Sequence, residues 1–153
     1  MAPQWTLDAG LRYSTVDFDS RDHYIVPGNG DDSGSARYRR ALPVAAIGYE
    51  PAAGTRLYAS YGRGFETPTL NEISYRPGGL PGLNFGLAPA LSTHVEAGVK
   101  TRVGDGLLTA AVFQVSTDDE IVSAGSSGGR TTFRNAGRTR RDGLELGLSL
   151  IHI

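Results

Sequence analysis

The segment that decides the fold is residues 58–79, YASYGRGFETPTLNEISYRPGG. Its first half alternates apolar and polar residues with period two, the pattern of a β-strand with two different faces. Its second half contains two prolines and a Gly-Gly pair, which end a strand, and LNEIS at 70–74 has room for one helical turn. We therefore predict a strand over 56–66 that runs into a long, turn-rich connection.

The rest of the chain repeats this organisation and contains no helix-length amphipathic segment. Short turns, PAAG at 51–54 and GDG at 104–106, alternate with long connections at 19–37, about 67–91 and 123–130. The sequence predicts an all-β fold, an antiparallel up-and-down meander of about six strands with no helix longer than two turns. The expected strands are 4–18, 38–50, 56–66, 92–103, 107–122 and 131–150.

Composition narrows the possible functions. The 153 residues are enough for one domain with a real core, and 21 of them are glycine, about twice the usual share. The absence of cysteine excludes disulfides, thiol catalysis and cysteine-ligated metals. A formal charge of −1 gives no basis for nucleic-acid binding driven by bulk charge. No run of 18 apolar residues is present, so no transmembrane helix is predicted.

The alternation predicts one apolar face and one polar face on the sheet. Trp5 and Tyr13 lie eight residues apart on the apolar face, which corresponds to about 20 Å of height in a tilted strand. That height matches a lipid-facing band with aromatic girdles, and Tyr49 is expected in the same girdle as Trp5. We expect the apolar face to carry Leu7, Leu11, Val95, Val99, Leu144 and Leu146, and the polar face to carry Thr6, Arg12, Glu96, Lys100 and Glu145.

Alternation by itself leaves two classes of protein open. A transmembrane barrel turns its apolar face outward to lipid, whereas a soluble small β-barrel, such as a lipocalin-like carrier, turns the same face inward.

Three segments resemble the barrel of TonB-dependent outer-membrane receptors: 58–79, HVEAGVK at 94–100 and NAGRTRRDGLELGLS at 135–149. The resemblance implies a fragment of a transmembrane barrel of about 22 strands in the outer membrane of a Gram-negative bacterium. It implies active uptake of a scarce ligand, energised by TonB through an N-terminal plug, although neither plug nor TonB box is recognisable here. The implied partners are outer-membrane lipid, lipopolysaccharide, TonB and a small-molecule ligand, and the implied protein is not an enzyme.

The resemblance leaves the ligand open between a ferric siderophore and pyrroloquinoline quinone. Segments such as GRGFETPTLNE and GGRTTFRNAGRTRR are similar to family members that take up the quinone. We expect recognition on the three long connections, chiefly 65–91. Candidates for a carboxylated quinone are Arg63, Arg76 and Arg130, and candidates for an iron–siderophore complex are Tyr75 and Phe85. We expect six charged side chains to project into the lumen of the barrel and to form charge pairs that hold the plug or the wall. They are Asp8, Arg12, Glu96, Lys100, Arg141 and Glu145.

Further charged residues have weaker functional signals. Arg138 and Arg140 share the parity of the apolar leucines, so we expect them just above the apolar band, facing lipopolysaccharide phosphates or pairing across strands. The three histidines, His23, His94 and His152, lack ligand spacing, and no catalytic triad or cofactor-binding motif is present, so we predict neither a metal site nor a cofactor.

The end of the sequence raises a separate expectation. LSLIHI at 148–153 matches what one reading frame of a transposon sequencing adapter would encode. We therefore expect the receptor sequence to occupy residues 1–147 and the last six residues to be a partial or complete artefact. The alternative is a genuine strand that continues to the end.

Overall fold

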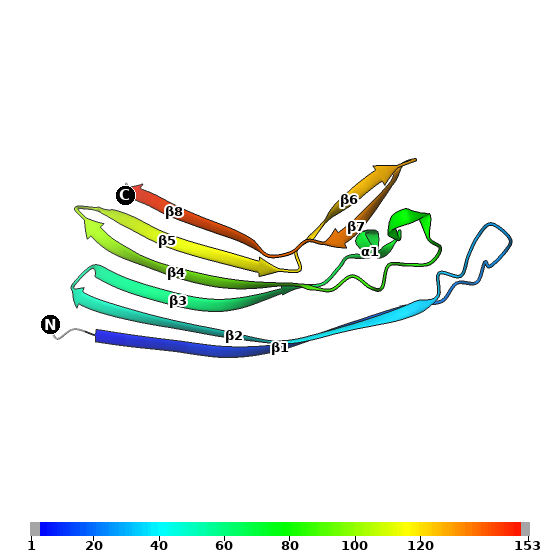
Figure 1. Ribbon diagram of the computed structural model, residues 1–153. Coiled ribbons are helices and arrows are strands. Elements are labelled where there is room, and N and C mark those ends of the chain that lie inside the picture. The colour runs from blue at the N-terminus through cyan, green and yellow to red at the C-terminus, as the bar shows by residue number, and fades with distance from the viewer. Residues whose placement is uncertain (1–3, 151–153) are drawn as a thin grey trace.

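The computed structural model describes residues 4–150 and contains one six-stranded antiparallel sheet in chain order, which confirms the predicted meander (Figure 1). Its order is β1-β2-β3-β4-β5-β8, and each strand pairs antiparallel with its neighbours in that order. The strands are β1 (Gln4–Ser20), β2 (Gly34–Ala52), β3 (Thr55–Glu66), β4 (Ala90–Val103), β5 (Gly106–Asp118) and β8 (Thr139–Leu150).

Two predicted strands were wrong in extent. The strand expected over 107–122 ends at Asp118, because Asp119 adopts a φ of 58°, a left-handed conformation that turns the chain out of the sheet. The strand expected over 131–150 is interrupted between Asn135 and Thr139. The intervening residues form a second, two-stranded sheet of β6 (Ile121–Ser127) and β7 (Arg130–Asn135), so the expected loop 123–130 is mostly a hairpin. This hairpin rises away from the six-stranded sheet (Figure 1).

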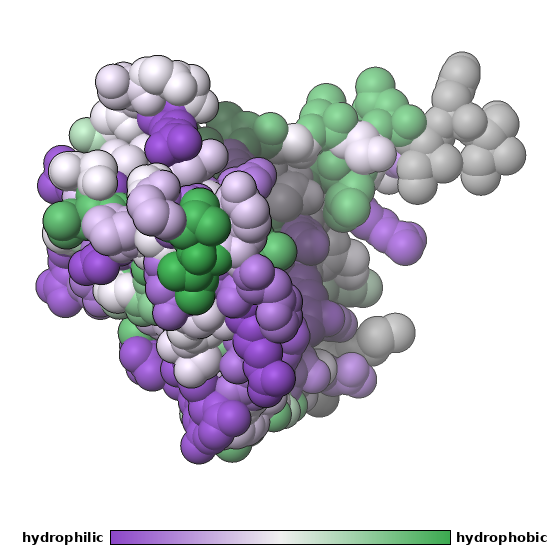
Figure 2. Space-filling model, turned by 90° about the vertical axis from the view of Figure 1, so that its right-hand side faces the viewer, coloured by the Kyte–Doolittle hydropathy of each residue, from purple (hydrophilic) through white to green (hydrophobic). Residues whose placement is uncertain are grey.

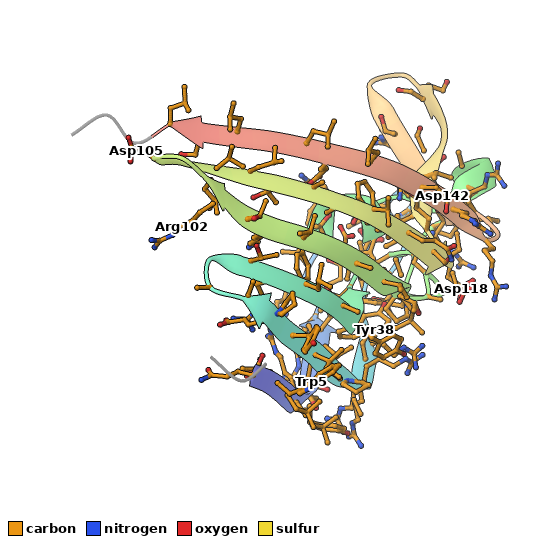
Figure 3. The ribbon with its side chains drawn as sticks, turned by 90° about the vertical axis from the view of Figure 1, so that its left-hand side faces the viewer. Trp5, Tyr38, Arg102, Asp105, Asp118 and Asp142 are labelled. Atoms are coloured by element: carbon orange, nitrogen blue, oxygen red, sulfur yellow. The ribbon has the colours of Figure 1, made fainter. Side chains whose placement is uncertain are left out.

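The connections alternate in length as predicted. Residues 53–54 and 104–105 form the short turns, and Gly54 and Gly104 have φ values of 80° and 59°, which suit glycine in a tight turn. The long connections 21–33, 67–89 and 119–138 lie together at the opposite end of the sheet (Figure 1). Figure 3 shows the same polarity, with Arg102 and Asp105 at the end with the short turns and Asp118 and Asp142 toward the other end. We call this other end the loop end.

The predicted helical turn is α1 (Leu70–Ile73). Its capping box explains why it forms: the Glu72 carboxylate accepts a hydrogen bond from the Thr69 backbone N–H at 2.7 Å, and the Glu72 N–H donates to the Thr69 hydroxyl oxygen. A short 3-10 turn, η1 (Pro77–Gly79), follows. None of the helices within residues 4–150 is long and apolar enough to cross a membrane.

The strand register confirms the two predicted faces. The apolar face consists of the odd residues of β1 to β4 and the even residues of β5 and β8, because residues paired across strands point to the same side. Its apolar side chains are open: Leu7 is 77% exposed and Leu146 is 72% exposed. Trp5 and Tyr49, predicted to share a girdle, stack with ring centroids 4.4 Å apart. The opposite side is called the polar face below.

The most deeply buried side chains lie outside the sheet. Ile73 is 1% exposed, and Ile73 and Pro68 are the largest fully buried side chains among the described residues. They belong to the 67–89 connection, whose Leu87 is also buried and accepts a hydrogen bond at its carbonyl from the Tyr38 hydroxyl of β2. The connection is therefore a packed unit on the long outer part of β2.

The last strand reaches into the segment expected to be an adapter. Leu148 pairs with Leu108, and Leu150 pairs with Gly106. Residues 151–153 lie outside the described residues, and the origin of 148–153 stays a prediction.

Candidate ligand site

A cavity of about 780 Å³ opens among the three long connections at the loop end. One wall comes from the 21–33 connection, a second from the segment after α1, and a third from the β6–β7 hairpin. The lining residues are Gly28, Asn29, Gly30, Asp32, Ser74, Tyr75, Arg76, Gly78, Gly79, Leu80, Pro81, Gly82, Gly125, Ser126, Ser127, Arg130 and Thr132. Figure 2 looks onto this end, where much of the surface is hydrophilic or neutral, with a strongly hydrophobic patch near the middle and smaller hydrophobic areas elsewhere.

Three of the five predicted ligand residues meet in this cavity. Tyr75 and Arg130 lie together, with the Arg130 guanidinium carbon 5.2 Å from the Tyr75 ring centroid, a cation–π geometry. Arg76 donates from Nη1 to the carbonyl of Pro81 at 3.3 Å, a long contact that leaves most of its guanidinium donors for another partner. Asp32 is the one acidic residue of the lining, so arginines outnumber acids by two to one.

Glycine backbone makes up much of the remaining lining. Gly78 and Gly79 have φ values of 78° and 69°, and a Cβ at either would meet no atom within 4 Å, so both face open space. Gly30 differs, since a Cβ there would lie 2.7 Å from the Cβ of Pro81. The absence of a side chain at Gly30 therefore allows the 21–33 and 67–89 connections to approach each other closely.

The other two predicted ligand residues lie elsewhere. Arg63 belongs to the apolar face, where it pairs in register with Thr93, on the opposite side of the sheet from the predicted lumen. The Phe85 ring packs on Gly34, so closely that a Cβ on this glycine would come within 2.7 Å of a ring carbon. Neither residue lines the cavity. The sequence already indicated this position of Arg63, because Arg63 lies an even number of residues from Leu57 and Tyr61 and therefore shares their face of the strand.

The six residues expected to face the lumen share the polar face by register. The Tyr58 hydroxyl donates to the Glu96 carboxylate at 2.5 Å, and the Lys100 ammonium lies 5.5 Å from the centroid of the Tyr58 ring. Arg141 forms an ion pair with Glu120 at 2.5 Å. Within residues 4–150 only Arg141 of these six forms a charge pair, since Glu96 and Lys100 both contact the neutral Tyr58, and Tyr58 and Glu120 were not predicted as partners. The expected role of these residues in holding plug or wall stays a prediction. The whole expected set is Asp8, Arg12, Glu96, Lys100, Arg141 and Glu145.

Arg138 and Arg140 both form ion pairs, but only the pair of Arg138 reaches another strand, because Asp142 lies on β8 together with Arg140. The expected contact with lipopolysaccharide phosphates stays a prediction. Arg138 Nε donates to Asp118 at 2.7 Å, and Arg140 donates through Nε and Nη2 to Asp142. Arg140 also belongs to a polar row across four strands, because Arg63 pairs with Thr93, Thr93 with Ser116, and Ser116 with Arg140. This row crosses the apolar face near the loop end, and the pair of Phe65 and Leu91 is the next one beyond it on the same face.

Sequence reasoning missed two asparagines that hold the cavity walls. Asn84 donates from its side chain to the carbonyl of Phe133 at 3.3 Å, and Asn135 forms three hydrogen bonds, two of them with the backbone of Ala88. Asn135 is the first residue of the segment 135–149, which the sequence indicates only as a barrel strand. Its role in hydrogen bonding therefore had no signal of its own in the sequence. Across residues 4–150, no group of three or more His, Cys, Asp or Glu side chains is placed to hold a metal ion.

The family of the chain follows from a match to a family model. Residues 1–150 match the model described as TonB dependent receptor-like, beta-barrel. The chain belongs to this family. Its members are outer-membrane β-barrel proteins of Gram-negative bacteria that act as receptors and transporters rather than enzymes.

Solved structures of TonB-dependent receptors share the fold of the chain. The copper transporter OprC matches over 97% of this chain at 19% identity with a TM-score of 0.75. The hemophore receptor HasR of Serratia marcescens was solved as a double mutant with its hemophore HasA and heme. It matches over 94% of this chain at 20% identity with a TM-score of 0.69. The FrpB iron transporter of Neisseria meningitidis matches over 97% of this chain at 16% identity with a TM-score of 0.67.

The chain is short beside these TonB-dependent receptors. It spans 24% of the OprC chain, 29% of the HasR chain and 21% of the FrpB chain. It therefore corresponds to a fragment of the receptor barrel, and the six described sheet strands do not close a barrel by themselves.

Proposed function

We propose that the chain forms part of the wall and outer mouth of a TonB-dependent outer-membrane receptor that takes up a compact anionic ligand. The carrying observation is the cavity at the loop end, which is lined by Arg76, Arg130 and Tyr75, with the Arg130 guanidinium over the Tyr75 ring. Guanidinium forks suit carboxylates. The arrangement supports binding without chemistry, in agreement with a transporter.

The exposed apolar face supports the membrane location. Leu7, Leu144 and Leu146 are each at least 65% exposed on the open sheet, and a lipocalin-like carrier would have to bury this face inside a closed barrel. The match to the receptor barrel family favours lipid as the cover instead. An apolar face with an aromatic pair at the end with the short turns fits a lipid-facing band. In this orientation the short turns face the periplasm and the cavity faces outward.

The composition of the cavity favours a carboxylated, planar ligand over an iron–siderophore complex. The expected aromatic platform for a siderophore is reduced to Tyr75, since Phe85 packs on Gly34, and the Tyr75 ring already carries Arg130. Two arginines remain for acidic groups. Together with the segment similarity described above, this favours pyrroloquinoline quinone, with a ferric siderophore as the second candidate.

The deciding experiment uses the complete receptor in a Gram-negative host that lacks competing receptors. Growth on glucose is measured when it depends on external pyrroloquinoline quinone, and growth under iron starvation is measured with a panel of siderophores. We expect rescue in the first assay, lost with Arg76→Ala and Arg130→Ala and kept with the surface variant Arg21→Ala. Rescue in the iron assay alone would exclude the quinone.

Two partners complete the proposal. We propose that TonB energises transport through the plug of the complete receptor, as the family resemblance implies. We also propose that the polar row from Arg63 to Arg140 meets lipopolysaccharide phosphates, because it lies on the apolar face near the loop end of the sheet and Arg63 forms no ion pair among the described residues. Less lipopolysaccharide should copurify with Arg63→Ala than with the parent, and equal amounts would remove Arg63 from the contact.

A further inference from the structure

Asn135 ends β7 and uses its whole side-chain amide in hydrogen bonds. Its Oδ1 accepts from the backbone N–H of Ala88 at 2.8 Å, and its Nδ2 donates to the carbonyls of Ala88 and Asp119, each at 2.8 Å. An amide offers two donors and one carbonyl oxygen, so both donors and the oxygen are in use. Only asparagine has this combination at this side-chain length.

These bonds join three segments that are far apart in the sequence. Asn135 belongs to the β6–β7 hairpin, Ala88 to the 67–89 connection, and Asp119 to the point where the chain leaves β5. The adjoining backbone adds a bond from the Ala136 N–H to the Glu120 carbonyl at 2.7 Å. Asn84 of the 67–89 connection adds a further bond to the hairpin, because its side chain donates to the carbonyl of Phe133 in β7.

The hairpin needs such an attachment. It forms its own two-stranded sheet, separate from the six-stranded one, and isolated two-stranded hairpins are marginally stable in water. Arg130 begins β7 and lies over Tyr75, which belongs to the 67–89 connection. The bonds of Asn135 therefore connect the same two segments that bring Arg130 and Tyr75 together.

We propose that Asn135 is a positioning residue that anchors the β6–β7 hairpin to the 67–89 connection and thereby holds Arg130 over Tyr75. Asn135 does not line the cavity, so it acts through the hairpin rather than by touching a ligand. The inference rests on the proposed function only where ligand affinity is the measurement, and the hairpin position can be measured without any ligand.

The first experiment measures that position in the complete receptor. Spin labels are attached to cysteines introduced at Ser123 and Leu80, and the distance between them is measured by electron–electron double resonance; the chain has no cysteine of its own. We expect a narrow distribution in the parent and a broad one in Asn135→Ala. Asn135→Asp should also be broad, because a carboxylate cannot donate to the two carbonyls.

Asn71→Ala is the matched control, since Asn71 is an exposed residue of α1 in the same connection. It should leave the distribution narrow. An unchanged distribution in Asn135→Ala would overturn the proposal whatever the receptor binds.

The second experiment is a double-mutant cycle on the binding of pyrroloquinoline quinone, measured by titration calorimetry. Asn135→Ala alone should weaken binding about tenfold, the scale of one to three lost hydrogen bonds. In the Arg130→Ala background the same change should cost clearly less, because the cation it positions is gone. Full additivity would overturn the positioning role, whereas an Arg130→Ala variant that binds like the parent would overturn the proposed site.

Discussion

The six-stranded wall and the loop assembly above it, which consists of residues 67–89 and the β6–β7 hairpin, are stabilised in different ways. The wall has continuous backbone ladders, but its apolar side chains stand open, with Leu7 77% exposed. The loop assembly has little regular structure, yet Ile73 is 1% exposed and Asn135 is fully hydrogen-bonded. The wall therefore depends on what surrounds it, whereas the loop assembly carries its own core and polar anchors.

The largest expected effect is in the loop assembly. Ile73→Ala removes its most buried large side chain and should destabilise the docked 67–89 connection by about 2–5 kcal/mol. Limited proteolysis of the complete receptor should then cut this connection much faster, while thermal unfolding of the barrel stays unchanged. Leu70→Ala, at a position 66% exposed on the same helical turn, is the control and should resist like the parent. A barrel that melts earlier in Ile73→Ala would show that the two regions share one core.

The next effect separates the two faces of the wall. Ala59 lies on the apolar face, in the row of Ala97 and Val112, and Ser60 lies next to it on the polar face. Ala59→Arg should cost about 2–4 kcal/mol in a bilayer, because it places a charge in lipid, and Ser60→Arg should cost less than about 1 kcal/mol. Urea unfolding of the receptor in phospholipid vesicles measures both. Equal costs for the two variants would contradict the lipid-facing assignment.

The smallest effect concerns the 21–33 connection, which lies at the same end but is held by local polar contacts. The hydroxyl and backbone N–H of Ser33 lower the pKa of the Asp31 carboxyl, and the N–H donates to it at 2.8 Å. A lowered folded-state pKa gives stability that is present above the ordinary value of 3.8 and is lost as the pH falls through the folded-state value.

Amide hydrogen exchange at Ser33 should therefore show weaker protection only as the pH falls below 3.8, after correction for the intrinsic rate. Asp31→Asn keeps an acceptor oxygen but does not titrate, so its protection should not change over this range. If Asp31→Asn lost as much protection at Ser33 in acid as the parent does, a titrating group other than Asp31 would be responsible.

Much of the wall could be predicted from the sequence because a period-two pattern also fixes which side each residue faces. Parity separated Leu146 from Glu145, and the position of Tyr49 at the end of the second strand correctly placed it in the same girdle as Trp5. The strand bounds were less accurate: β2 begins at Gly34 rather than at 38, because pairing with β1 continues beyond the alternating stretch.

The loop assembly was less predictable because its structure depends on contacts between distant segments. The Gly/Ser-rich run 123–130 has low strand propensity, yet its residues 123–127 belong to β6, where Gly125 and Ser126 pair with Thr132 and Thr131 of β7. Tyr75, Arg76 and Arg130 were chosen by residue type and lie together, but no local pattern showed that Phe85 would pack on Gly34. The anchoring role of Asn135 likewise depends on Ala88, 47 residues away.

The tip of the β6–β7 hairpin has a consequence for engineering. Gly128 and Gly129 connect the strands with φ values of 58° and 78°, and a Cβ at either would meet nothing within 4 Å. The tip is therefore a permissive place for added sequence, far along the hairpin from its anchor at Asn135. In the proposed orientation, a short epitope inserted between these glycines would be displayed on intact cells and stained by an antibody that cannot enter them. The same epitope inserted at the short turn of Gly104 would become accessible only after the outer membrane is permeabilised.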